Sequence, residues 1–353
     1  MSRNHGWSNL CPDILRPILK VLNSKDFHRA RTVCSNWYSV SRTCIPPLYP
    51  WRILFRKPST LLLFDTGEEK VRVFEHPELD LSENHCIASS GSWLLMLDRR
   101  LNFNILNVFT RERIDLPTME LSFLGSEDDI KEWECLVGSY DIVQSKKSTV
   151  LWINERTRDF VVAWVYERNF LFTFKKGDET WRRSLEGTEC NYMTFKDHKL
   201  YVLTWDNYIK ILDLSGEIPR ESLENPLLNH QFSVDVRPER SIWRKRITIT
   251  NSGEFLVIQS SGVLGKNFLF EIFKMNMESS KWERVDSIGD EMLIFGHGVT
   301  VRSSVNGGSI CFVENDVRHG RNSGVFDLAT STITWAKDVG HWDATRWFVP
   351  GYG

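Results

Sequence analysis

The sequence holds few side chains that could perform covalent chemistry, and they lie in its second half. Cys190 and His198 are close together along the chain, and a cysteine beside a histidine can act as an activated nucleophile. Such a pair also needs a third group that orients the histidine and a defined pocket around the thiol. A lone histidine near a turn is more often a solvated surface residue. We therefore expect no catalytic residues, and the chain is predicted not to be an enzyme.

Two further stretches could hold charged ligands. The segment 262–267 (GVLGKN) lacks both the full phosphate-loop pattern and the Ser or Thr that would reach magnesium. A basic run around Trp243 could contact an acidic partner or nucleic acid, although a solvated strand edge is the more common role. Its members are Arg237, Arg240, Arg244, Lys245 and Arg246. Because no His/Cys cluster has the spacing of zinc ligands either, we expect no metal, no cofactor and no nucleic acid.

The composition is that of an ordinary globular chain. Of its 353 residues, 41% are hydrophobic and 25% are charged, and a net charge of −2 gives no general attraction to nucleic acid or anionic membranes. Seven scattered cysteines argue against a disulfide framework. The N-terminus lacks the apolar core of a signal peptide, and the longest apolar runs are too short to cross a bilayer. We expect the nucleus, the cytoplasm or both, and no membrane partner.

The elements that would position a binding site begin with a short helical stretch between Trp7 and Trp37. Pro12 suits the first turn of a helix, where its missing N–H would be unpaired anyway. Apolar residues then recur on one broad face, as Ile14, Leu15, Ile18, Leu19 and Leu22. A second helix, capped by Ser24 or Asp26, carries the apolar positions Phe27, Ala30, Val33, Cys34 and Trp37. So few short helices cannot bury both faces alone, and the remaining apolar surface is expected to meet a partner.

This stretch resembles the F-box family. The F-box pattern opens with Leu-Pro and closes with Val-Cys-x-x-Trp, here Val33, Cys34 and Trp37. One departure is Cys11, where the family often has its first proline. The resemblance implies binding to a Skp-type adaptor, which links the chain to a cullin–RING ubiquitin ligase. The residues that it assigns to this interface are Leu10, Pro12, Ile14, Leu15, Ile18, Leu22, Val33, Cys34 and Trp37.

From about residue 60 onward, the chain has the pattern of β structure with a weak internal repeat. Each unit has an apolar strand and a polar turn, often followed by a tryptophan or isoleucine. The unit then ends in charged or proline-containing residues. Matching positions are Phe74, Phe109, Phe174, Leu212, Phe273 and Phe326, with a mean spacing of about 50 residues. Short strands at such a period predict a kelch-like β-propeller of about six blades, with five or seven as alternatives. The fold class is therefore multidomain, with a short α-helical module followed by an all-β domain.

Three tryptophans follow the turns of these units. A large ring at such a position can fill the wedge between neighbouring blades, and we expect this of Trp181, Trp282 and Trp335. The alternative is that these rings line a ligand pocket. Further apolar runs precede the repeat strands and are expected to pair with them as hairpins. They begin at Trp93, Val150, Lys199, Glu254 and Ser309.

The chain also resembles a plant family of F-box proteins, the KIB type, whose second domain was once known only as a domain of unknown function. The matching residues are Pro46, Pro47, Tyr49, Pro50 and Trp51, with segments 26–31 (DFHRAR) and 33–38. This resemblance covers almost the whole chain and implies a substrate receptor of a ubiquitin ligase, without naming the substrate. The expected organisation is an F-box over 1–47, a Pro/aromatic linker over 48–59 and a propeller-like recognition domain over 60–353.

Two hypotheses of different classes follow. In the first, the chain is the substrate-recognition subunit of an SCF-type (Skp–cullin–F-box) E3 ubiquitin ligase, and its propeller binds a target protein for ubiquitination. In the second, the propeller's central channel serves a small-molecule sensor or an enzyme, and the F-box controls the chain's own turnover. The lack of paired carboxylates, metal ligands and a nucleophile motif favours the first. A third, simpler alternative is an ordinary helical hairpin packed on its own β domain.

Two features of the β domain bear on target binding and closure. Long polar segments are the expected target contacts, at 120–134, 215–246 and 315–322. Residues 347–349 are too apolar for a free tail, and a propeller must join its last blade to its first. We therefore expect them to pair beside a strand at 61–64 and to close the ring.

Overall fold

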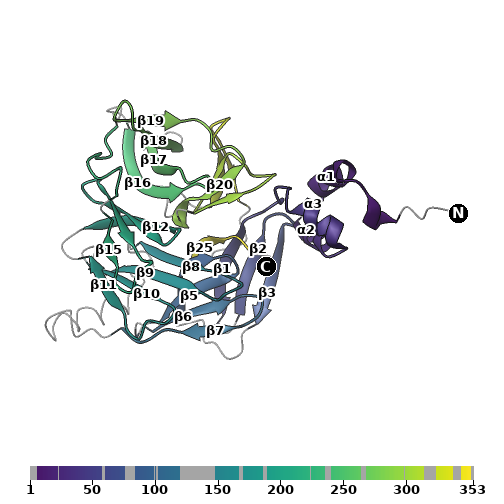
Figure 1. The fold of residues 1–353 in the computed structure, drawn as a ribbon, viewed down its shortest axis with the longest axis horizontal. Coiled ribbons are helices and arrows are strands. Elements are labelled where there is room, and N and C mark those ends of the chain that lie inside the picture. Colours follow the sequence, from purple (N-terminus) through teal and green to yellow (C-terminus); the bar gives the residue numbers. More distant parts are fainter. Residues whose placement is uncertain are drawn as a thin grey trace.

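The structure is a computed structural model of the chain. It describes residues 6–22, 24–57, 60–75, 84–98, 100, 102–119, 148–166, 170–185, 189–222, 224–234, 240–263, 268–297, 299–313, 323–336 and 343–350. Within these residues, a small helical module precedes a ring of β-sheets and projects from one side of it (Figure 1).

The helical module has its own small core. It comprises η1 (Trp7–Asn9), α1 (Pro12–Val21), α2 (Ser24–Arg31) and α3 (Ser35–Ser41). Pro12 is the first residue of α1, as the sequence predicted, because that position needs no N–H. The core draws on α1, α2 and α3 and consists of Leu15, Leu19, Phe27, Ala30, Trp37 and Val40. The module is thus held together by its own apolar residues.

Six blade-like sheets form the ring, and the expected β-propeller is confirmed (Figure 1). The first blade has the order β25 (Asp343–Phe348), β1 (Trp51–Lys57), β2 (Thr60–Asp65) and β3 (Lys70–Glu75). The second contains β4 (Asn84–Ser90), β5 (Trp93–Asp98), β6 (Phe103–Asn107) and β7 (Arg113–Asp115). The third contains β8 (Thr149–Ile153), β9 (Phe160–Tyr166), β10 (Phe170–Lys175) and β11 (Arg182–Leu185). The fourth contains β12 (Cys190–Lys196), β13 (Lys199–Thr204), β14 (Ile209–Asp213) and β15 (Arg220–Glu221).

The last two blades are joined into one nine-stranded sheet by a parallel pairing between Ile249 and Val299. The fifth blade contains β16 (Arg240–Ile249), β17 (Phe255–Val263), β18 (Phe268–Asn276) and β19 (Lys281–Val285). The sixth contains β20 (Glu291–Ile294), the short helix η3 (Phe295–His297), β21 (Val299–Arg302), β22 (Ser309–Phe312), β23 (Gly324–Asp327) and β24 (Thr332–Trp335). Here β20 lies between β21 and β22, so the sixth blade is less regular than the others.

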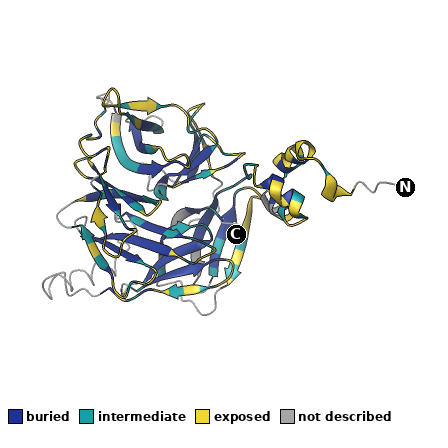
Figure 2. Ribbon diagram, in the orientation of Figure 1, coloured by how far each residue is buried: buried dark blue, intermediate teal, exposed yellow. Residues whose placement is uncertain are grey.

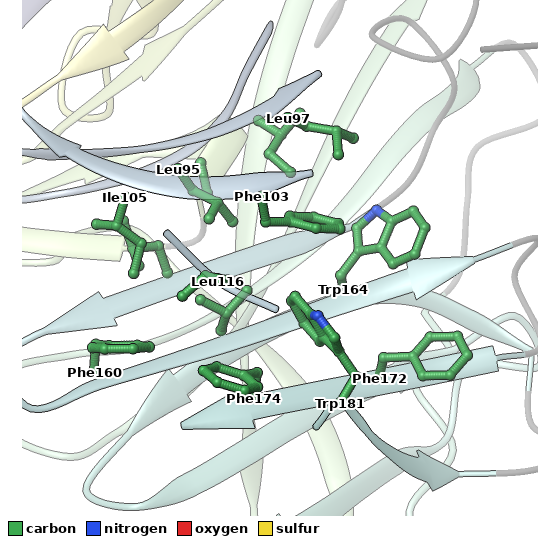
Figure 3. Close-up of a cluster of buried hydrophobic side chains, with 14 of the residues drawn as sticks. Leu95, Leu97, Phe103, Ile105, Leu116, Phe160, Trp164, Phe172, Phe174 and Trp181 are labelled. Atoms are coloured by element: carbon green, nitrogen blue, oxygen red, sulfur yellow. The ribbon is translucent and has the colours of Figure 1, made fainter. Parts of the chain in front are cut away.

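Aromatic rings fill the wedges between blades at two of the three expected positions. Trp181 lies between the second and third blades, 4.8 Å from the ring of Phe103, and its indole N–H donates to the carbonyl of Pro117 (Figure 3). Trp282 packs edge-on against Phe232 in the cluster between the fourth and fifth blades. The expectation is wrong for Trp335, which is exposed on the outer strand β24. Its ring packs edge-on against Phe312 of the same blade, with 5.7 Å between the ring centres.

The strand directions define two faces of the ring. Neighbouring strands are antiparallel within each of the first five blades, and β4, β8, β12 and β16 contact one another as its inner strands. The end of each inner strand and the start of the next strand outward therefore share one face. We name this the helix-side face, because β1 begins there at Trp51, directly after the helical module. At the opposite face, which we name the far face, the inner strands of the second to fifth blades begin, and the last strand of each preceding blade runs toward it.

Two of the three segments expected to contact a target are bounded by strand ends at the far face. Segments 120–134 and 315–322 lie outside the described residues, between β7 and β8 and between β22 and β23. Segment 215–246 is not the loop that was expected, because it contains β15 and most of β16. Its basic residues obscured the strand pattern in the sequence.

The C-terminal strand closes the ring, but beside a different strand from the one expected. β25 pairs antiparallel with β1, with Trp51 opposite Phe348, rather than with β2. β1 lies inside the stretch 48–59 that was expected to be a linker, so the β domain begins at Trp51 rather than at residue 60. Ile53 and Leu54 are both fully buried, which explains why this stretch folds into a blade.

Removal of β25 is expected to open the ring. A chain cut after Asp338 loses Trp347 and Phe348, whose burial is worth roughly 1.5–3 kcal/mol each, against the ~5–15 kcal/mol that stabilises a typical domain. We expect a β domain that is insoluble or that melts at a clearly lower temperature in scanning calorimetry. A chain that lacks only residues 351–353 keeps β25 and serves as the control. An unchanged melting temperature after the longer cut would show that β25 does not close the ring.

Candidate adaptor-binding surface

The residues that sequence analysis assigned to the adaptor interface divide into a buried and an exposed group. Leu15 and Trp37 are buried in the core of the helical module. Leu10, Ile18, Leu22 and Cys34 are half-buried at the edge of this core. Pro12, Ile14 and Val33 are exposed. The first group can support an interface, whereas the exposed residues are available to contact a partner directly.

Side-chain hydrogen bonds from α3 hold the N-terminal residues in place. The indole N–H of Trp37 donates to the carbonyl oxygen of Trp7 at 2.9 Å. The side-chain amide of Asn36 donates to the carbonyls of Ser8 and Leu10 at 3.0 and 2.8 Å. These bonds satisfy backbone oxygens that no helix or strand would otherwise pair. They fix the segment before α1 against α3, and so set the position of Trp7.

Three exposed apolar residues extend this surface beyond the predicted set. Trp7 is 70% exposed and Val21 is 83% exposed, and Tyr38 is also exposed. Val21 follows Ile14 by two helical turns, so the helical period of α1 could have revealed it. Figure 2 shows that exposed residues dominate η1 and α1, which lie on the side of the module away from the propeller. We name Trp7, Ile14, Val21 and Val33 the apolar module surface.

Two exposed ion pairs lie on the helices of the module. Arg16 pairs with Asp13 at 3.1 Å on α1, and Arg29 pairs with Asp26 at 3.2 Å on α2. Both pairs join residues three positions apart and are largely exposed, so they contribute little to stability.

The Cys190 and His198 pair does not form a catalytic site. Cys190 begins β12, whereas His198 lies in the turn after this strand ends, so the whole length of β12 separates them. Burial raises the pKa of the Cys190 thiol, which keeps it protonated and poorly nucleophilic. The ring of His198 lies near that of Trp152 instead.

The basic run lies inside the fifth blade rather than on an open surface. The ammonium of Lys245 donates to the side-chain oxygen of Asn207 at 2.7 Å, and burial lowers its pKa. The guanidinium of Arg246 stacks over Tyr192 at 4.4 Å. Both side chains are half-buried, and their contacts with aromatic rings stabilise this part of the ring. Arg237 lies outside the described residues.

Gly262 serves packing rather than phosphate binding. A Cβ atom at this position would come within 2.2 Å of the Trp243 ring, so only glycine leaves room for that ring. The following residues, 264–267, lie outside the part of the chain that the structure describes. Among the described residues, no three His, Cys, Asp or Glu side chains converge as metal ligands would, and no helix is long and apolar enough to span a membrane.

The fold and the helical surface agree with comparisons to known protein families. Residues 7–48 match the F-box domain, and residues 63–327 match the KIB1-4 beta-propeller. This chain belongs to the F-box proteins with a KIB1-4 propeller. The F-box match ends just before β1, and the propeller match begins within β2.

Relatives of this F-box protein share its whole length. An Arabidopsis thaliana protein named for an F-box, At2g33200, is 51% identical, and the match covers 100% of both chains. F-box only protein 7 of the same plant is 45% identical over 100% of this chain and 96% of its own. The combination of helical module and propeller is therefore common to these proteins.

The two tryptophans of the F-box should respond differently to truncation. Trp37→Ala removes a buried ring and its hydrogen bond to Trp7, and core changes of this kind cost about 3–5 kcal/mol. We expect hydrogen exchange across residues 6–41 to become fast, as measured by mass spectrometry. Trp7→Ala is the matched control, because the side chain of Trp7 is exposed and only its carbonyl accepts the bond. Equal protection in both variants would contradict the supporting role of Trp37.

Proposed function

We propose that this F-box protein is the substrate-recognition subunit of an SCF-type E3 ubiquitin ligase. Its F-box binds a Skp-type adaptor, and through it a cullin–RING ligase, while its propeller holds a target protein for ubiquitination. The observation that carries the proposal is the apolar module surface, which consists of four exposed apolar residues on a domain that matches the F-box. In this role the protein itself is non-catalytic and acts in the nucleus, the cytoplasm or both.

The F-box is attached to the propeller by hydrogen bonds. Such an attachment suits a receptor that must hold its target at a defined distance from the bound adaptor. The carbonyl of Leu48 accepts hydrogen bonds from the hydroxyl of Ser303 at 2.9 Å and from the amide of Asn306 at 3.1 Å. The backbone N–H of Ser304 donates to the carbonyl of Pro46 at 3.1 Å. The chain after α3 is thereby tied to the turn between β21 and β22, at the helix-side face.

The far face offers the better surface for a target. Trp205 and Tyr208 are exposed in the turn between β13 and β14, and Leu228 is exposed in the connection between the fourth and fifth blades. These residues all lie at the far face, on loops held by rigid blades, as binding residues commonly do. A target bound there leaves the F-box free at the opposite face.

A charge placed in the apolar module surface should weaken adaptor binding. Ile14 is 52% exposed, so Ile14→Glu leaves the core of the F-box intact but places a carboxylate in an apolar contact. We expect the affinity for a purified Skp-type adaptor to fall at least tenfold, about 1.4 kcal/mol, in surface plasmon resonance. Ile218→Glu is the control, because Ile218 is 61% exposed on the propeller. Adaptor affinity that is the same in both variants would count against the proposal.

Truncation of the far-face aromatics should remove targets and spare the adaptor. We expect the double variant Trp205→Ala and Tyr208→Ala to capture fewer proteins than the unmodified chain from plant tissue in which the proteasome is blocked. The reason is that interface aromatics often carry a large share of binding energy. Quantitative mass spectrometry of the captured material measures both the loss of targets and the retention of the adaptor. Trp335→Ala is the control, because it removes an exposed tryptophan from the outer edge of a blade. An unchanged set of captured proteins would show that recognition lies elsewhere.

A further inference from the structure

A cleft of about 490 Å³ lies where the F-box meets the propeller. One wall comes from α2, α3 and the chain that follows them, and the other comes from the sixth blade, the end of β25 and the turn after β4. This volume falls within the ~300–1,000 Å³ of typical small-molecule sites. The cleft lies at the helix-side face, where the inner strands β4, β21 and β25 supply part of its lining, and none of the four residues of the apolar module surface lines it.

The floor of the cleft is apolar. Phe27 of α2 lines the cleft together with Ile294 and Trp347 of the propeller, and all three residues are almost completely buried. Val299, Val301 and Val349 continue the same lining. The ring of Trp347 is held in place by an indole hydrogen bond to the carbonyl of Phe312 at 2.8 Å. The floor is therefore a preformed apolar surface rather than a flexible gap.

All the ionisable side chains along the cleft except Cys44 are basic. Arg31 and Arg42 come from the F-box, His297 comes from the propeller, and no Asp or Glu side chain lies among the described residues that line it. The guanidinium of Arg31 lies 5.6 Å from the centre of the Tyr38 ring, while Arg42 is exposed. Hydroxyl groups of Ser41, Ser89 and Ser90 add hydrogen-bonding capacity. The charge of the lining favours an anion.

The geometry points to a binding site for a small organic acid with an apolar body. Its carboxylate would lie at the arginines of the F-box, since a guanidinium suits a carboxylate in both shape and charge. Its apolar body would lie on the floor at Trp347 and Ile294. Because such a ligand contacts both domains at once, it stabilises the orientation of the F-box relative to the propeller. The site itself does not depend on the proposed ligase function.

The test uses the full chain and pairs of probes that share an apolar body, one with a carboxylate and the other with a neutral polar head group. Phenylbutyrate is compared with phenylbutyramide, and octanoate with octanol, by isothermal titration calorimetry. We expect saturable binding of both acids, at least about tenfold tighter than binding of their neutral counterparts. No binding of either acid at millimolar concentration would overturn the proposal, and so would equal affinity for acid and neutral probe.

Variants locate the bound acid. Arg42→Gln should weaken binding of the acids at least about tenfold and leave the neutral probes unchanged. Arg29→Gln is the matched control, since Arg29 is an exposed F-box arginine paired with Asp26 and does not line the cleft. Val299→Trp should fill the cleft and weaken all four probes. Equal losses in Arg29→Gln and Arg42→Gln would overturn the site.

The same variants separate this proposal from the ligase function. Arg42→Gln should retain full affinity for the Skp-type adaptor, because Arg42 lies outside the apolar module surface. Loss of acid binding with adaptor binding intact therefore supports the cleft alone. Failure of adaptor binding in the unmodified chain would count against the ligase function and leave the cleft proposal standing.

Discussion

The antiparallel pairing of β25 with β1 is the constraint on which the rest of the molecule depends. Side chains alternate between the two faces of a strand, so adjacent residues of β25 reach different neighbours. Phe348 enters the apolar cluster between the first two blades, whereas Trp347 packs with Met292 and Cys311 of the sixth. Two consecutive residues thereby join three blades. β25 covers the edge of β1 that would otherwise be open, and open sheet edges are prone to aggregation.

This closure also fixes where the F-box is attached. β1 follows the helical module after a short connection, so the strand that receives β25 is also the one that carries the helices. The hydrogen bonds to Leu48 and Pro46 come from the turn after β21, in the sixth blade. The F-box is therefore held by the first and last blades together. The cleft at this junction exists because these parts converge there.

Much of the architecture could be predicted from the sequence, because it rests on local periodicity. The apolar face of α1, the blade repeat and the closing strand all follow from the spacing of apolar residues. Phe174, Leu212, Phe273 and Phe326 lie on the next-to-last strands of their blades, as a common repeat requires. Phe74 and Phe109 do not, because Phe74 is on the fourth strand and Phe109 is in a turn. The early blades depart from the repeat, which shifted the expected start of the domain.

Other features depend on contacts between distant residues and leave no local pattern. The strand β9 is buried along its whole length and shows no alternation, so the run at Val150 was matched with the wrong partner strand. The bonds from Trp37 and Asn36 to the chain before α1 join side chains to backbone carbonyls, which any residue type supplies. The interior position of Lys245 and Arg246 likewise depends on rings from other strands. For the same reason, the division of the F-box residues into a buried and an exposed group could be read only from the structure.

The separation of β1 and β25 along the chain has a consequence for biosynthesis. β1 leaves the ribosome early, but its inner partner is made last, on the order of tens of seconds later at ordinary rates of translation. The ring cannot close before β25 has emerged, whereas the F-box core is complete once α3 has emerged. A nascent chain thus presents its helices while its blades are still open. During that interval the unpaired edge of β1 is the part of the molecule that most needs protection by a chaperone.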